Sequence, residues 1–325
     1  MTCKRRPSSV SPDQITSILL IKLGAFGDMV FADGVMRLIR SHYKNAQITL
    51  LTEPFYAKLW ANAPYIDGTM QDKRDSRFNL MAMRRLKKQL IERKFDLVID
   101  LQNSPRSRQY RGWLKNSILC GKQEPADYVY QQDVHKAQSV ADVLGEQIAL
   151  LDIHTENNYE PDMNWLGKAA QETHALSECA NSIQEKSILL VPGASARNAD
   201  KRWPHFAALI NLLTEHGWHC YTAPGPDEID LCASLPCTSI LLDGKPLTFA
   251  ELAMISQRFA YVVGNDTGPS HLVAACQRPS LILLGARGQP DRIRINNMMH
   301  FLQTEDISGL SPEEVFADLM DRLPQ

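Results

Sequence analysis

The sequence lacks the cysteine patterns of disulfide-stapled or zinc-bound domains. Its seven cysteines form an odd, scattered set, with no CxxC pair and no cysteine–histidine cluster at zinc-binding spacing. Cys232 and Cys237 are the closest pair, and we interpret both as ordinary core or surface thiols. Such thiols fit a protein of the reducing cytoplasm.

Long hydrophobic runs and a strong charge of one sign are also missing. No apolar stretch reaches the roughly 20 residues that a membrane-spanning helix needs. The apolar run near the amino terminus is short and contains Lys22, so it indicates a buried strand and neither a signal peptide nor a membrane span. The net charge of −2 at pH 7 argues against a protein built to bind nucleic acid.

Three common phosphate and metal motifs are absent as well. The chain has no DxD, no P-loop GxxxxGK[ST] and no GxGxxG. We therefore expect no metal and no other cofactor. A diphosphate bound to this protein would be stabilised by a lysine and by backbone amides at a helix start rather than by Mg²⁺.

The sequence does contain a repeated alternation of short apolar runs and helical patterns. Its 325 residues, 44% hydrophobic and 22% charged, suit a globular protein of two domains. The predicted strands are 17–21, 47–51, 95–100, 187–191, 218–223, 239–242, 261–264 and 280–284. The predicted helices are 30–41, 54–60, 78–94, 205–216, 249–258, 271–276 and 311–323, the last with Ser311 as its N-cap. This alternation predicts α/β domains with parallel sheets covered by helices on both faces.

The alternation is interrupted between about residues 120 and 186. Residues 157–161 and the polar stretch 171–186 indicate a connection, after which strands and helices resume. We expect two Rossmann-like domains, 1–175 and 176–325, that face each other across a cleft, and the last helix is a candidate to pack back on the first domain. Ligands of open α/β sheets bind outside the carboxyl ends of the strands, so the loops that follow strands are the candidate sites.

The loop GNDTGPSH joins a buried-looking strand to a helix. Asp266 or Thr267 could simply cap that helix. The alternative is a phosphate site, in which the Thr267 hydroxyl, the amide of Gly268 and the helix dipole face a diphosphate. His271 lies in the first turn, where it is either structural or a donor to a phosphate oxygen.

Two further loops follow strands of the second half. In SARNADKRWP, Lys201 is either part of a solvated basic loop or a point charge on a phosphate, with the Ser195 hydroxyl available to the same group. In PGPDE, Asp227 or Glu228 could bind a ribose or sugar hydroxyl, unless the segment is a plain turn.

The first strand leads into KLGAFGDM, where an acid follows a glycine-rich turn. Gly24 and Gly27 would let an acceptor approach the backbone closely. Asp28 either caps the following helix or acts as a general base on an acceptor hydroxyl. The second interpretation applies if the C-terminal half binds a nucleotide diphosphate attached to a transferable group.

Together these segments resemble glycosyltransferase family 9, the heptosyltransferases. The similarity covers nearly the whole chain and rests on LLIKLGAFGDMVFADGVMRLIR, FDLVIDLQNSPRSR, LLVPGASARNADKRWP and YVVGNDTGPSHLVAAC, in that order. The resemblance implies a GT-B fold and inverting transfer of heptose from ADP-heptose to the inner core of lipopolysaccharide, without a metal. It also implies a cytoplasmic enzyme at the inner face of the bacterial inner membrane.

The resemblance further implies roles for individual residues. Asp28 is similar to the family's catalytic base, and Lys201 to its diphosphate-binding lysine. The positions that match the donor site are Ser195, Asp227 or Glu228, Asp266, Thr267, Gly268 and His271. The segment GARGQPDRIRINN, after the strand at 280–284, departs from the Gly-Pro turn that is common in the family.

The resemblance also bears on the basic stretch from residue 73 to 122. By default, the helix at 78–94 would be a solvated face. The family's acceptor is an anionic glycolipid, which a basic N-terminal domain would bind while docked on an anionic membrane surface. Arg106 and Arg108, which follow the strand at 95–100, are the basic candidates for acceptor binding.

Two other functions fit the same architecture. A nucleotide-sugar epimerase acts on the donor alone and needs no acceptor site, so the basic first half argues against it. A non-catalytic sugar-nucleotide-binding protein would have no need of both Asp28 and Lys201. Fold analogy alone does not decide among these functions.

Overall fold

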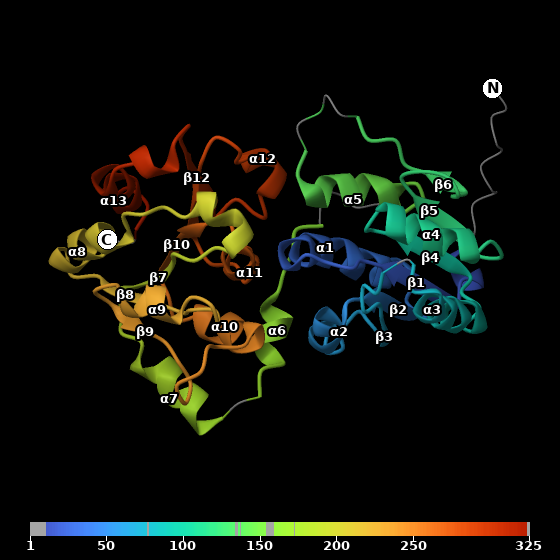
Figure 1. Cartoon of the computed structure of the whole chain (residues 1–325), viewed down its shortest axis with the longest axis horizontal. Coiled ribbons are helices and arrows are strands. Elements are labelled where there is room, and N and C mark those ends of the chain that lie inside the picture. Colours follow the sequence, from blue (N-terminus) through green and yellow to red (C-terminus); the bar gives the residue numbers. More distant parts are fainter. Residues whose placement is uncertain are drawn as a thin grey trace. The chain divides into compact units, whose positions relative to one another are not determined.

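The structure is a computed structural model that describes residues 11–323 apart from 77, 134, 135, 137, 154–158 and 172 (Figure 1). The basic amino-terminal segment and residues 157, 158 and 172 of the expected connection lie outside this part of the chain. Within the described ranges, no helix is both long enough and apolar enough to cross a bilayer.

Contacts divide the chain into two compact units, Met1–Pro161 and Asp162–Gln325. Each unit contains one six-stranded parallel sheet, which confirms the predicted α/β fold class. The division falls before the expected boundary at residue 175, because α6 (Asn164–Lys168) packs on α10 (Phe249–Ser256). The two helices approach so closely that a Cβ on Gly167 would lie 3.0 Å from the Met254 amide nitrogen.

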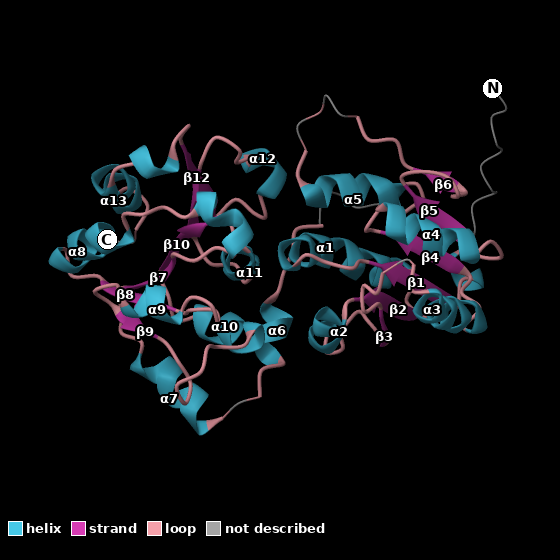
Figure 2. Ribbon diagram, viewed as in Figure 1, coloured by secondary structure: helices cyan, strands magenta, loops and turns pink. Residues whose placement is uncertain are grey.

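The sheet of unit 1 has the order β3-β2-β1-β4-β5-β6 (Figure 2). Its strands are β1 (Ser17–Ile21), β2 (Gln47–Thr52), β3 (Gly68–Gln71), β4 (Leu97–Asp100), β5 (Ile118–Gly121) and β6 (Tyr128–Val129). The central strands β1 and β4 are buried on both faces, as their continuous apolar sequences predict.

The helices of unit 1 pack against this sheet. They are α1 (Phe26–His42), α2 (Pro54–Trp60), α3 (Leu80–Glu92), α4 (Pro105–Trp113) and α5 (Val140–Ala149), after a 3₁₀ turn at Pro12–Gln14. On α3, helical spacing places Met83, Leu86 and Leu90 on one buried face, where they share a core with Leu19 and Ile21 of β1. The opposite face of α3 is exposed.

The sheet of unit 2 has the order β12-β11-β10-β7-β8-β9. Its strands are β7 (Ser187–Val191), β8 (His219–Thr222), β9 (Thr238–Ser239), β10 (Tyr261–Asn265), β11 (Ser280–Leu284) and β12 (Met299–Gln303). Strand β9 is shorter than the predicted run 239–242 and begins one residue earlier, because the residues that pair with β8 are Thr238 and Ser239.

The other helices of unit 2 are α7 (His174–Ser182), α8 (Phe206–Glu215), α9 (Ile229–Ala233), α11 (Gly268–Ala275), α12 (Pro290–Ile293) and α13 (Pro312–Met320), with 3₁₀ turns η2 (Ala196–Lys201) and η3 (Ile307–Gly309). Ser311 caps α13, as predicted, in a capping box with Glu314. Val315 and Leu319 of α13 share a core with Leu209 of α8, so the closing helix packs within unit 2.

The strand order reverses at one point in each sheet. In unit 1 this switch point lies between β1 and β4, and in unit 2 between β7 and β10. Loops that leave the carboxyl ends of such strands diverge to opposite faces and leave a crevice for ligands. Most of the candidate residues lie on these four loops and on the helix starts that follow them.

In each unit, the helix that follows a central strand begins earlier than predicted. Helix α1 begins at Phe26 and not at residue 30, and α11 begins at Gly268 and not at His271. Apolar spacing alone did not reveal the polar and glycine-containing first turns. Asp28 therefore lies inside the first turn of α1 rather than at the tip of a loop.

Candidate active-site residues

Three predicted donor-site residues meet at the carboxyl ends of β7 and β10. Asp266 follows β10, and its Oδ2 accepts a hydrogen bond from Lys201 Nζ at 2.6 Å. Its Oδ1 lies 2.9 Å from Nε2 of His271 in the first turn of α11. The side chain of Asp266 is only 16% exposed, so this carboxylate is largely held by its two partners.

The electrostatics of Asp266 follow from these contacts. Burial is the largest influence and disfavours the charged form, but hydrogen bonds and charges from His271 and Lys201 together outweigh it. The result is a pKa of about 2 for Asp266. The carboxylate is therefore ionised at neutral pH. Because a lysine ammonium has three donors, Lys201 can hold Asp266 and still donate to a phosphate oxygen.

The amino terminus of α11 supplies a second anion-binding feature. Thr267 occupies the N-cap position, but its side chain makes no capping hydrogen bond. Its Oγ1 instead lies 3.3 Å from Ser270 Oγ, and the Ser270 hydroxyl donates to the Asn265 carbonyl at 2.7 Å. The first amides of α11, including that of Gly268, thus have no side-chain cap, which favours an anion at this end.

Asn265, which the sequence analysis did not single out, fixes the relative position of these segments. It is fully buried, and its Nδ2 donates to the carbonyl of Pro192 at 2.8 Å. Its Oδ1 accepts a hydrogen bond from the Trp203 amide at 3.1 Å. One side chain thus ties the loop after β7 and the segment that carries Lys201 to the end of β10. The only sequence signal was a polar residue at the end of a buried strand.

Of the other donor-loop candidates, Glu228 lies against a neighbouring loop, whereas Asp227 and Ser195 are exposed. The Glu228 carboxylate lies against the loop after β7, where a Cβ on Gly193 would fall 1.8 Å from Glu228 Oε1. Asp227 is exposed. Ser195 is also exposed, and its Oγ accepts a hydrogen bond from Asn198 Nδ2 at 3.1 Å. Of the two acids in PGPDE, the structure brings only Glu228 to the β7 loop.

A cavity of about 370 Å³ adjoins Lys201 and Asp266 within unit 2. Segments 283–288 and 305–307 form much of its wall, and Asp200 contributes another carboxylate. Arg287 Nη1 lies 3.4 Å from Asp200 Oδ2. The first four residues of GARGQPDRIRINN, the segment that departs from the family pattern, therefore line this cavity, although none of them was a candidate site residue.

In unit 1, Asp28 is half-buried in the first turn of α1. Among the residues that the structure describes, none donates a hydrogen bond to its carboxylate or forms an ion pair with it. Gly24, four residues earlier, has φ +133°, and a Cβ there would lie 2.7 Å from Tyr56 Cε2. Glycine is thus required at position 24 by conformation and by space. Gly27 lies within α1 and does not have a positive φ.

Lys22 is a second residue that sequence reasoning missed at this site. It is almost fully buried at the end of β1, and its Nζ donates to the Leu101 carbonyl at 3.4 Å. Burial lowers the pKa of Lys22, while the nearby carboxylates of Asp28 and Asp100 act in the opposite direction. A lysine inside an apolar run was the available signal, but it does not reveal the carboxylates that lie near it.

The two candidate arginines of α4 have different environments. Arg106 forms a bidentate ion pair with Asp72, at 2.6 Å from Nη2 to Oδ1 and 2.7 Å from Nε to Oδ2. Tyr110 also donates to Asp72, at 2.6 Å. The guanidinium of Arg106 is thus occupied by a contact within unit 1, which argues against its predicted role in acceptor binding. Arg108 is exposed, and its Nη1 donates to Gln123 Oε1 at 2.8 Å, so it is the better placed of the two to meet an anion.

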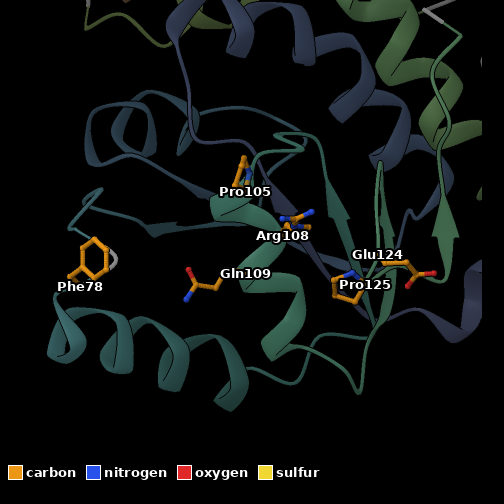
Figure 3. A pocket seen from close by; sticks show the side chains of 6 residues that line it. All are labelled: Phe78, Pro105, Arg108, Gln109, Glu124 and Pro125. Carbon is orange, nitrogen blue, oxygen red and sulfur yellow. The ribbon is translucent and has the colours of Figure 1, made fainter.

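Arg108 borders an open hollow of about 530 Å³ on unit 1 (Figure 3). Pro105 and Gln109 of α4 line one side, and Glu124 and Pro125 lie beyond Arg108. Phe78, just before α3, forms the far border. The hollow thus combines apolar rings with the exposed guanidinium of Arg108 and the exposed carboxylate of Glu124.

Metal-ligand clusters are not evident at either site. Among the described residues, no three His, Cys, Asp or Glu side chains are grouped closely enough to hold a metal ion. The chain thus has two units, each built on one six-stranded parallel sheet, with the Lys201–Asp266–His271 cluster at the uncapped start of α11 in the second unit.

Comparison with known proteins identifies the family. Residues 83–300 match the model of glycosyltransferase family 9 (heptosyltransferase). Lipopolysaccharide heptosyltransferase 3 of Escherichia coli is 24% identical over 312 residues, 85% of either chain. The structure of E. coli ADP-heptose lps heptosyltransferase II has a TM-score of 0.72 at 18% identity, covering 94% of this chain and 98% of that one. E. coli heptosyltransferase WaaC with ADP has a TM-score of 0.74 at 16% identity, covering 94% and 99%.

The chain therefore belongs to glycosyltransferase family 9. This confirms the resemblance found in the sequence and the assignment as a glycosyltransferase. The likeness to the solved structures shows a GT-B fold.

Proposed function

We propose that this protein is an inverting, metal-independent heptosyltransferase that transfers heptose from ADP-heptose to an acceptor in the lipopolysaccharide core. The observation that carries the proposal is the cluster of Lys201, Asp266 and His271 beside the uncapped start of α11. A cation and helix amides suit a diphosphate that leaves with negative charge. The family membership is consistent with this substrate class.

In the proposed reaction, Asp28 removes the proton from an acceptor hydroxyl as the hydroxyl oxygen attacks the anomeric carbon of the donor. A new carbon–oxygen bond forms, the bond to the diphosphate breaks, and ADP leaves. Attack opposite the leaving group inverts the anomeric configuration. Lys201 and the α11 amides stabilise the charge that develops on the diphosphate, which lowers the barrier.

The two units have different proposed roles. Unit 1 binds the acceptor, with Gly24 and Gly27 near the base and Arg108 on an acidic group. Unit 2 binds the donor. In that region Glu228 contacts the ribose, and the hydroxyls of Ser195 and Thr267 bind the diphosphate.

The proposed acceptor also determines where the enzyme works. A lipopolysaccharide core is built on a lipid, so the enzyme would act in the cytoplasm as a peripheral protein at the inner face of the inner membrane. The exposed basic side chains of α3 are consistent with attraction to an anionic lipid surface.

A direct transfer assay tests the proposal. The protein is incubated with ADP-heptose and a heptose-deficient core acceptor, and we measure ADP release and the mass of the glycolipid product. We expect one heptose to be added, with inverted configuration by NMR, at the same rate with and without EDTA. Loss of activity in EDTA that Mg²⁺ restores would contradict the metal-independent mechanism.

Two controls separate this function from the alternatives considered above. With ADP-heptose alone, an epimerase would produce an isomer, whereas the proposed transferase leaves the donor sugar unchanged. In a thermal-shift panel of ADP, UDP, GDP and CMP, we expect ADP to raise the midpoint most, because a ligand stabilises the folded state that binds it. A stronger effect of UDP or GDP would contradict the assignment of the donor.

A further inference from the structure

Three neighbouring apolar side chains stand in solvent at the start of α3. Phe78 is 93% exposed, Leu80 65% and Met81 81%. They account for most of the large apolar side chains that are strongly exposed in the described chain, and all three lie within four residues. A cluster of exposed apolar groups at one point marks an interaction surface rather than ordinary surface scatter.

The backbone holds this apolar cluster in a defined position. The Asn79 side chain caps α3 by accepting a hydrogen bond from the Ala82 amide at 3.2 Å. The Asn79 amide in turn donates to the Ser76 carbonyl at 2.8 Å. Met83 and Leu86 anchor the next turn in the core. The cluster therefore projects from a fixed helix start.

Cations follow the apolar cluster directly on the exposed face of the same helix. Arg84, Arg85, Lys87 and Lys88 are all exposed. Glu92 is the one acidic residue within α3, at 3.7 Å from Lys88. We call the seven residues 78, 80, 81, 84, 85, 87 and 88 the α3 patch. Its exposed side chains are either large and apolar or positively charged.

This combination fits a lipid surface better than other partners. Lysine and arginine side chains reach anionic headgroups while adjacent Phe, Leu and Met side chains enter the acyl region. A nucleic acid would use the cations but leave the apolar groups exposed. Phe78 also borders the hollow next to Arg108 (Figure 3).

We propose that the α3 patch is a membrane anchor: Phe78, Leu80 and Met81 insert into an anionic bilayer, and the four cations of α3 bind its headgroups. This inference rests on the proposed function only in the choice of membrane. Each element of it can be measured without donor or acceptor. It deepens the proposed function by giving the lipid surface a specific set of contacts.

Vesicle binding by the full chain tests the anchor. We expect binding to vesicles with phosphatidylglycerol, much weaker binding to pure phosphatidylcholine, and release by salt. Neutralising the cations (Arg84→Gln, Arg85→Gln, Lys87→Gln and Lys88→Gln together) should weaken binding at least tenfold. The variant with Phe78→Ser, Leu80→Ser and Met81→Ser should also lose at least tenfold. Phe55→Ser is the matched control, because Phe55 is an exposed aromatic of α2 outside the patch.

Insertion itself has a separate readout. In Phe78→Trp, the added fluorescence should be quenched by lipids brominated in the acyl chain, whereas that in Phe55→Trp should not. Binding to both kinds of vesicle alike, full binding by either set of α3 variants, or no quenching at position 78 would overturn the anchor. So would an absence of vesicle binding.

The test of the membrane anchor can be separated from the test of the proposed function. Leu80→Ser with Met81→Ser should retain transfer to a short, water-soluble acceptor while losing vesicle binding. Transfer without vesicle binding by the parent protein would refute the anchor alone. Vesicle binding without heptose transfer would refute the proposed function and leave the anchor standing.

Discussion

Asp266 contacts two basic groups at once, Lys201 at 2.6 Å and His271 at 2.9 Å. Lys201 ends the turn η2, while Asp266 follows β10. The hydrogen bond between Lys201 and Asp266 therefore depends on the residues that hold these two segments in position. Asn265 does so through its hydrogen bonds to Pro192 and Trp203. We therefore regard Asn265 as a positioning residue for Lys201.

The first prediction concerns this pair of residues. Lys201→Ala should weaken ADP binding about ten- to a hundredfold, since a hydrogen bond to a charged group contributes roughly 1.5–3 kcal/mol. Asn265→Ala should weaken it as well, but only while Lys201 is present. Calorimetry on both single variants and the double variant measures this coupling.

The matched control is Lys245→Ala, which removes an exposed lysine of unit 2 and should leave ADP affinity unchanged. If Asn265→Ala weakens binding equally in the Lys201→Ala background, the two effects are independent. In that case Asn265 does not act through Lys201.

The second prediction is a dependence of stability on pH. Asp266 has a pKa of about 2 in the folded protein against an ordinary value of 3.8, so between these values the unfolded state binds more protons. The stabilisation from Asp266 is therefore complete above about pH 4 and declines as pH falls through 2, by up to about 2 kcal/mol. Urea unfolding from pH 5 to 2 should show the free-energy gap between the parent and Asp266→Asn closing on acidification. A constant gap would mean that Asp266 is not held in its charged form.

At the scale of single residues, the sequence could identify candidate residue types but not the residues that they contact. Asp28, Lys201 and Asp266 follow predicted strands, and that placement was enough to nominate them. The ion pair of Arg106 with Asp72, 34 positions away, could not be foreseen, because it depends on how α4 packs near the edge strand β3. The same limit applied to Asn265 and to the buried Lys22.

Among the elements, those with strong local patterns were predictable. β1, α2, β7 and β11 have the predicted bounds, because each is a short apolar run or a helix opened by proline. β3 was missed because only one of its four residues is buried, which leaves no apolar run to detect. Helix α4 was missed because PRSRQYRGW contains few apolar residues, and its capping box of Ser104 and Ser107 was the remaining signal.

Strand β4 also ends on an acid, and its role differs from that of Asp28. Asp100 is fully buried, and its Oδ2 lies 3.0 Å from Nε of the buried Arg111 of α4. Burial raises the pKa of Asp100, and the charge of Arg111 opposes that rise. Arg111 also donates to the carbonyls of Gln123 and Pro125. The pair thus fastens α4 and the loop after β5 to the sheet.

The third prediction tests this fastening. Asp100→Ala leaves a buried guanidinium without its counter-charge and should lower the free energy of unfolding by about 3–5 kcal/mol. Lys88→Ala, which breaks the exposed pair with Glu92, should change it by less than about 1 kcal/mol. Urea denaturation measures both. Equal small effects would show that Asp100 and Arg111 do not stabilise the unit.

At the scale of the whole molecule, the proposed reaction divides its chemistry between two units. Each has its own sheet and its own core, and each carries its candidate residues at the switch point of its sheet. The fold class could be predicted because the βα alternation occurs twice along the chain. The domain boundary could not be fixed in the same way, because α6 is short and joins unit 2 by close packing on α10.

This division gives the fourth prediction and the most direct test of the account. In Asp28→Asn, the base is lost from unit 1 while the Lys201–Asp266–His271 cluster of unit 2 is untouched. We expect heptose transfer to fall by about 10²–10⁴-fold, the range for loss of a general base, with ADP affinity unchanged. The measurement is the transfer rate and the ADP dissociation constant of the same preparation. Transfer at the parental rate, or a parallel loss of ADP binding, would contradict the assignment of Asp28 as the base.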